Sequence, residues 1–221
     1  MGATRTVGLG NGARPWDDGE MLIRNHDDAG DDETRWRSFV QSQGFGHFVA
    51  SGRDRDIPVI VPTQFLLDGD RLVFHLARAN PVFEALAENP QCVMSVAGDW
   101  AYIPGAWKAI NDEDPALGIP TTYYGAVQLT GLATIVDDHP AVASILADQV
   151  ADLEPHTASV HPSGHGAMLG AIRAIVVEVT TVRAKMKYGA NVDQSHRRHV
   201  AQLLGDRDGP GDAAALRQLQ I

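Results

Sequence analysis

The residues from 72 to 81 combine an apolar strand pattern with side chains that bind rings and anions. Apolar residues alternate with His75, which predicts a β-strand that presents this imidazole on one face. Arg78 follows the strand and carries a fork of donors suited to a phosphate or carboxylate. Asn80 and Pro81 then predict a short helix ending near residue 88, because Asn accepts free amide hydrogens and proline fits the first turn. We expect a cofactor site at this junction, the alternative being a core histidine beside a surface arginine.

Two further segments carry side chains that are suited to binding a cofactor. Residues 99–128 include Tyr102 and Tyr123 near expected strand ends, where aromatic rings can wall a flat ligand or simply pack in the core. Residues 183–191 include Lys185 and Lys187, which share one face of a strand because they are two positions apart. This pair can meet an anionic group or remain a solvated strand face.

The sequence gives no support to several common classes of enzyme. It contains no phosphate-loop glycine signature, no nucleophile elbow and no paired-cysteine metal motif. Three histidines, His156, His161 and His165, share one loop, but their spacing fits no zinc signature. We therefore assign no metal site and no catalytic acid or base.

Composition indicates a globular protein with an acidic surface. The 221 residues carry a formal net charge of −10, which disfavours attraction to nucleic acids and anionic membranes. No apolar run approaches the ~20 residues of a membrane span, and the single cysteine, Cys92, cannot form an internal disulfide. We expect a cytoplasmic protein without a membrane segment or an export signal.

Short strands joined by hairpin-like turns dominate the middle of the chain. Residues 68–70 read Asp-Gly-Asp, a hairpin signal between two of these strands. The strands are expected at 45–51, 57–67, 71–76, 91–97, 100–103, 123–136 and 172–187, and helices at 31–44, 81–88, 140–153 and 193–204. This pattern predicts a mainly β protein with peripheral helices, an antiparallel barrel whose closure removes exposed strand edges. We expect a flexible leader over 1–20, the barrel domain over 21–205 and a helical tail over 206–221.

Three segments occur together in an order that resembles a known family. They read His75-Leu-Ala-Arg-Ala-Asn-Pro81, Trp100-Ala-Tyr-Ile-Pro104 and Ala184-Lys-Met-Lys-Tyr188. In this respect the chain is similar to PaiB-like proteins over residues 21–204, a family usually described as flavin mononucleotide (FMN)-binding negative transcriptional regulators. The resemblance implies an antiparallel split β-barrel related to the pyridoxamine phosphate oxidase barrels, which forms a homodimer with cofactor sites at the subunit interface.

The leading hypothesis that follows is a flavin-dependent oxidoreductase or redox-linked regulator acting on a small molecule, with electrons carried by FMN. The cofactor-binding residues expected on this basis are His75, Arg78, Asn80, Gln64, Tyr102, Tyr123, Lys185 and Lys187. The arginine and the lysines would hold the phosphate, and His75, Gln64 and the tyrosines would face the isoalloxazine. Two segments depart from better-known members: Gln64 stands where many have a histidine, and Pro120-Thr-Thr-Tyr-Tyr124 replaces a Pro-Thr-Trp-Asn segment.

Two alternatives remain open. Piperazate synthases are similar to PaiB-like proteins and share the His-x-x-Arg-Ala-Asn-Pro pattern, but they use haem to form a nitrogen–nitrogen bond from an N-hydroxylated amino acid. On that reading the cofactor is haem b and His75 is an axial iron ligand. The third hypothesis is a non-catalytic transcriptional regulator. Its only local cationic cluster is at Arg197 and Arg198, so we do not expect direct DNA binding.

Overall fold

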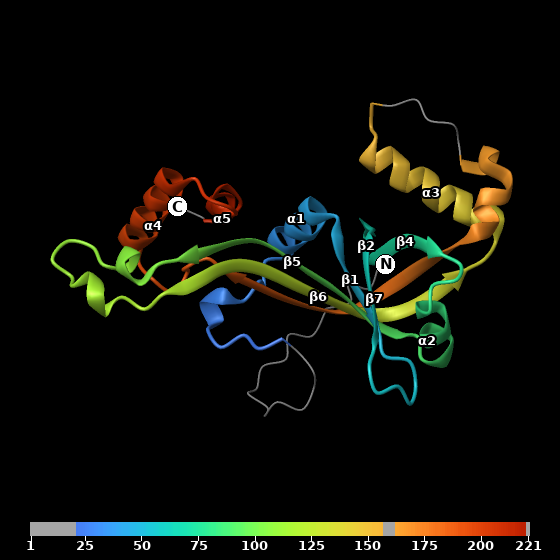
Figure 1. Cartoon of the computed structure of the whole chain (residues 1–221), viewed down its shortest axis with the longest axis horizontal. Coiled ribbons are helices and arrows are strands. Elements are labelled where there is room, and N and C mark those ends of the chain that lie inside the picture. Colours follow the sequence, from blue (N-terminus) through green and yellow to red (C-terminus); the bar gives the residue numbers. More distant parts are fainter. Residues whose placement is uncertain (1–20, 157–161, 220–221) are drawn as a thin grey trace, which may run out of the picture. The chain divides into compact units, whose positions relative to one another are not determined.

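A computed structural model of the chain describes residues 21–156 and 162–219 and contains one seven-stranded sheet (Figure 1). Its strands follow the order β2-β1-β5-β6-β7-β4-β3. Strand β1 pairs antiparallel with β2 and β5, and β4 pairs antiparallel with β3 and β7. The strand bounds are Phe45–Ala50 (β1), Val59–Gln64 (β2), Leu66–Asp68 (β3), Arg71–Ala77 (β4), Gln91–Ile103 (β5), Thr121–Val136 (β6) and Ile172–Lys187 (β7). The prediction of a mainly β, antiparallel protein is confirmed.

In the part of the chain that the structure describes, five α-helices and four 3₁₀ segments accompany the strands. The α-helices are Glu33–Gln43 (α1), Val82–Glu88 (α2), His139–Leu153 (α3), Gln194–Arg207 (α4) and Asp212–Gln218 (α5). The 3₁₀ segments are His26–Asp28 (η1), Gly105–Lys108 (η2), Pro115–Leu117 (η3) and Pro162–Ala171 (η4). Local chemistry starts two of the helices as expected. The Asn80 side chain accepts the amide hydrogen of Val82, and Asp193 accepts those of Ser195 and His196.

Three predicted boundaries were wrong, each for a physical reason. The strand expected at 57–67 divides at Phe65 because its two parts have different partners: residues up to Gln64 pair with β1, and Leu66–Asp68 pairs with β4. Strand β5 runs unbroken where two strands were expected, since Asp99 takes a φ of +48° without ending it. Helix α4 continues past Gly205, the expected stop, and ends at Arg207 before the left-handed Asp208.

The described chain divides into two compact units, here called the first unit and the second unit. The first contains residues 40–96, 128–156 and 162–182, and the second contains 21–39, 97–127 and 183–219. The boundaries expected at residues 20 and 205 stay predictions, and the leader over 1–20 lies outside the described residues.

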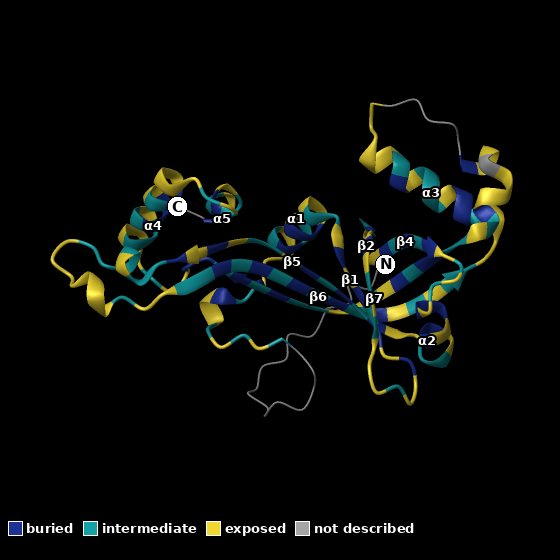
Figure 2. Cartoon of the chain, viewed as in Figure 1, coloured by how far each residue is buried: buried dark blue, intermediate teal, exposed yellow. Residues whose placement is uncertain are grey.

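Each unit has a buried core of its own (Figure 2). In the first unit, Phe48 and Phe74 have no exposed surface and pack edge to face with ring centroids 4.9 Å apart. In the second unit, Phe39, Ile103 and Met186 are buried. Among the described residues, no helix combines the length and the apolar character needed to cross a membrane.

Candidate cofactor site

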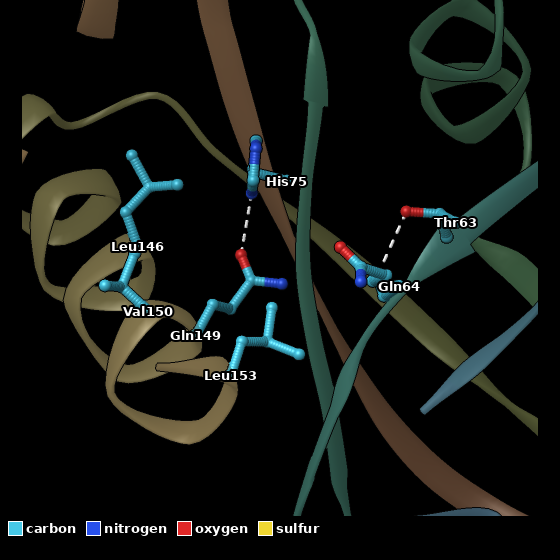
Figure 3. Close-up of a pocket in the computed structure, with 7 residues that line it drawn as sticks. All are labelled: Thr63, Gln64, His75, Leu146, Gln149, Val150 and Leu153. Carbon is cyan, nitrogen blue, oxygen red and sulfur yellow. Dashed lines mark hydrogen bonds between the residues drawn. The ribbon is translucent and has the colours of Figure 1, made fainter. Parts of the chain in front are cut away.

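A cavity of about 210 Å³ lies in the first unit, where side chains of β2, β4 and α3 meet (Figure 3). Its lining is Thr63, Gln64, His75, Leu146, Gln149, Val150 and Leu153. The structure thus brings together two of the predicted site residues, His75 and Gln64. Polar groups from the strands face an apolar wall supplied by α3, the composition typical of small-molecule sites.

Strand alternation places His75 in this cavity. Along β4, Leu72, Phe74 and Leu76 are buried in the core, so the intervening residues face the other side of the sheet. Helix α3 covers that side and packs against β4. Asp138 caps the helix by accepting the Ala141 amide hydrogen at 3.0 Å, which fixes where α3 begins.

Gln149 of α3 forms the closest polar contact to His75. Its Oε1 lies 2.7 Å from His75 Nδ1, and the glutamine is only 5% exposed. Sequence reasoning missed this residue, because the helix was recognised by its apolar positions alone. A signal was present: Gln149 lies three residues after Leu146 and seven after Val142, so a polar side chain interrupts the apolar stripe.

Arg78 follows β4 as expected, but its guanidinium donates three hydrogen bonds to other residues of the chain. Nε donates to the Gly170 carbonyl at 2.7 Å, and the terminal nitrogens donate to Asp137 at 2.8 Å and to the Ile172 carbonyl at 3.3 Å. Arg173 binds the same Asp137 oxygen at 2.7 Å. Two guanidinium groups therefore share one carboxylate oxygen. The phosphate-binding role of Arg78 stays a prediction.

The Asn80 oxygen is engaged in starting α2, through a 3.0 Å bond from the Val82 amide. This confirms its predicted role as a helix cap. Its role in cofactor binding stays a prediction.

The second unit holds the remaining predicted site residues. Lys185 Nζ lies 5.6 Å and Lys187 Nζ 5.9 Å from the centre of the Tyr124 ring, so the two ammonium groups share one face as predicted. Lys185 donates to the Leu22 carbonyl at 3.1 Å, and Lys187 donates to the Thr121 hydroxyl at 2.8 Å. Because Arg78 belongs to the first unit, the meeting of these three cations around one phosphate remains a prediction.

The two predicted ring contacts in the second unit differ sharply in exposure. Tyr102 is 51% exposed, whereas Tyr123 is 2% exposed and packs edge to face against Tyr188 with centroids 6.2 Å apart. Burial raises the pKa of the Tyr123 phenol. Its surroundings are those of a core residue, the packing alternative that the sequence left open.

Among the described residues, other titratable groups provide neither a reactive thiol nor a metal site. Burial raises the pKa of the Cys92 thiol to about 12, which keeps it protonated and unreactive. Within residues 21–156 and 162–219, no three His, Cys, Asp or Glu side chains group as metal ligands. His161, one of the three loop histidines, lies outside the described residues. Beside the cationic pair of α4, His196 contacts the carboxylates of Asp193 and Glu113 at 2.6 and 3.2 Å, which adds negative charge there.

Two solved structures share this fold. The flavocytochrome Anf3 from Azotobacter vinelandii aligns with a TM-score of 0.60 and 21% identity, covering 80% of this chain and 77% of its own. A protein from Mycobacterium smegmatis that binds FAD and haem aligns with a TM-score of 0.56 and 19% identity, covering 77% and 78%. Together with the antiparallel sheet, these similarities confirm the split-barrel fold.

A sequence comparison identifies the family. Residues 21–181 match the family described as "Putative FMN-binding domain". A comparison with proteins of curated function finds no match. The matched segment contains the strand-to-helix junction, the cavity and the whole of α3, and stops within β7. The chain therefore belongs to the FMN-binding split-barrel family that its three resembling segments together predicted.

Proposed function

We propose that this protein is a homodimeric FMN-binding protein that performs small-molecule redox chemistry at the cavity between β4 and α3. The observation that carries the proposal is the placement of His75 and Gln64 in one cavity of a chain from an FMN-binding family. Both side chains can exchange hydrogen bonds with the polar edge of a flat ring. Leu146 and Val150 offer an apolar wall against which a ring can lie.

The cavity fits one edge of a flavin and not the whole cofactor. Its volume of about 210 Å³ is below the roughly 300–1,000 Å³ of sites that enclose a small molecule. Leu153 lines the cavity and is nevertheless 55% exposed, so apolar surface remains open beside it. A second copy of the chain would cover this surface and complete the site.

FMN, when bound, supplies the electron transfer, and the residues of the chain bind and orient it. Arg78 keeps two of its five N–H donors outside the bonds to Asp137, Gly170 and Ile172, and these suit a phosphate. Lys185 and Lys187 supply two further cations on one face. No residue is assigned as a general acid or base.

The test is a titration of the purified protein with FMN, followed by flavin absorbance and fluorescence. We expect saturable binding that weakens roughly tenfold or more in Arg78→Met and in the double variant Lys185→Met/Lys187→Met, because each removes charge-assisted bonds. Arg71→Met, at the opposite end of β4, is the matched control and should bind like the wild type. Unchanged affinity in both test variants would contradict the phosphate assignment.

A second candidate is a haem enzyme with His75 as an axial ligand, resembling the piperazate synthases. Among the described residues, His75 Nε2 has no hydrogen-bond partner, while Nδ1 is held by Gln149. This is the usual arrangement of a histidine that ligates a metal. The absorption spectrum separates the candidates, since haem gives an intense Soret band and a flavin gives broad bands in the blue and near ultraviolet.

A further inference from the structure

We propose that Gln149 is a positioning residue that fixes which nitrogen of His75 is free to bind a ligand. The glutamine holds the proton on Nδ1, so Nε2 is the acceptor. The group bound at His75 must then be a hydrogen-bond donor or a metal ion, and not a carbonyl oxygen. This inference rests on the proposed function in taking the cavity as the cofactor site.

The contact itself sets the tautomer. The 2.7 Å distance joins His75 Nδ1 to the amide oxygen Oε1 of Gln149, and an amide oxygen can only accept. Nδ1 must therefore carry the hydrogen. A neutral imidazole has one N–H, so Nε2 keeps its lone pair.

Because Gln149 is buried, its hydrogen bond can hold the His75 ring in one orientation. Gln149 is 5% exposed, so water competes little for its amide. Its helix is anchored by Val142 and Ala143, which pack in a buried cluster with Leu169 and Ala174. The amide oxygen is therefore presented to His75 from a fixed helix and not from a loop.

The other side of the imidazole is available. Figure 3 shows the second ring nitrogen pointing away from Gln149. No described residue forms a hydrogen bond with Nε2, and the cavity lining contains no Asp, Glu, Lys or Arg. The bond from Gln149, and not an ion pair, is therefore the interaction that orients the ring.

This arrangement restricts the ligand chemistry. Nε2 can accept from an N–H or O–H group, or donate its lone pair to a metal ion. The edge of a flavin facing it would have to present an N–H. A haem would present its iron, and Gln149 would then act as the outer partner that aligns the ligating histidine.

The direct test is the tautomer of His75 in the protein without added cofactor, read from two-bond ¹H–¹⁵N correlation spectra. We expect the wild type to show the Nδ1–H form. Gln149→Met removes the acceptor while nearly preserving side-chain volume, and should shift His75 toward Nε2–H. Gln64→Met makes the same change in the same cavity without touching the bond, and should leave the tautomer unchanged. A wild type with its proton on Nε2, or a Gln149→Met variant that keeps the Nδ1–H form, would overturn the proposal.

A binding measurement separates this inference from the proposed function. Titrations with hemin and with FMN should both be made on the wild type and on Gln149→Met, with circular dichroism to confirm folding. For hemin we expect affinity to fall roughly 10- to 100-fold in the variant, the usual effect of removing an outer-shell partner. A wild type that binds neither probe yet shows the Nδ1–H form would sink the proposed function and leave the tautomer assignment standing. A variant that binds the wild type's cofactor with unchanged affinity would sink the positioning role alone.

Discussion

Arg55 holds both carboxylate oxygens of Glu88, which ties the segment between β1 and β2 to the end of α2. Nε donates to Oε2 at 2.8 Å and a terminal nitrogen donates to Oε1 at 2.5 Å. The amide of Arg53 adds a third bond to Oε2 at 2.9 Å. The pair therefore anchors the last residue of α2, the helix whose first turn follows Arg78 in the chain. The bonds from Arg55 and Arg53 lower the pKa of Glu88 to about 2.

The stability contributed by Glu88 should depend on pH. The pKa of its carboxyl is 4.5 ordinarily and about 2 in the folded protein. The contribution is therefore fully present above pH 4.5 and is lost as the pH falls toward 2. We expect Glu88→Gln to lower the melting temperature by a few degrees at most near neutral pH, the range of exposed ion pairs. In urea unfolding curves, the difference from wild type should stay constant between about pH 7 and 5 and shrink below about pH 4.5.

The control for this measurement is Glu154→Gln, because Glu154 is also exposed and follows α3. It should show no such pH-dependent difference. A Glu88→Gln deficit that stays constant across the pH range would show that the carboxylate charge is not what stabilises α2.

Gly131 is expected to tolerate no side chain. A Cβ at this position would lie 2.3 Å from the Glu178 carbonyl oxygen and 2.7 Å from a methyl group of Val177. Backbone of the neighbouring strand cannot move aside cheaply, so Gly131→Ala should reduce the free energy of unfolding by about 1–3 kcal/mol. Chemical denaturation measures this directly, and a variant as stable as the wild type would show that the strands are not this close.

Gly205 should respond in the opposite direction. It lies inside α4, and a Cβ there would meet nothing within 4 Å. Alanine lowers the entropy lost on helix formation, so Gly205→Ala should raise the free energy of unfolding by roughly 0.5–1 kcal/mol. The same denaturation experiment checks it, and a destabilised variant would indicate that α4 ends earlier, as the sequence suggested.

The homodimer is testable without any cofactor. We expect sedimentation equilibrium of the protein without cofactor to give twice the mass of the chain, and a separate FMN titration to give one FMN bound per chain. Leu153→Asp would place a charge on exposed apolar surface beside the cavity and should weaken both association and FMN binding. A monomer that binds FMN with the same affinity as the concentrated protein would contradict a shared site.

Local sequence patterns were sufficient to predict the strands and helices that carry the expected site residues. The alternation around His75, the cap at Asn80 and the Asp-Gly turn at 68–69 act over a few residues, and each has its predicted counterpart in β4, α2 and the β3–β4 hairpin. The partners of these residues lie far away in sequence. Gln149 lies 74 residues after His75, and Asp137 lies 59 residues after Arg78. Such contacts depend on how α3 packs on β4, which no local pattern encodes.

Predicted strand and helix boundaries were wrong where strand pairing or the conformation of a neighbouring residue outweighed local propensity. The chain changes partner at Phe65, from β1 before it to β4 after it, and strand propensity does not contain the choice of a partner strand. Gly205 was expected to stop a helix, but α4 continues to Arg207 because the left-handed residue that ends it is Asp208. Tyr123 illustrates the same limit for the site, since a tyrosine near a strand end can face a ligand or the core, and only packing decides.

The most direct test of the account is cofactor binding by a protein that lacks the cavity imidazole. FMN and hemin should be titrated into the wild type, His75→Ala and His47→Ala, the last being an exposed histidine on β1 of the same unit. We predict that the wild type binds one of the two and that His75→Ala binds it roughly tenfold more weakly or not at all, because a contact worth about 1.4 kcal/mol is lost. His47→Ala should match the wild type. Equal affinity in His75→Ala and wild type would contradict the claim that the cavity between β4 and α3 is the cofactor site.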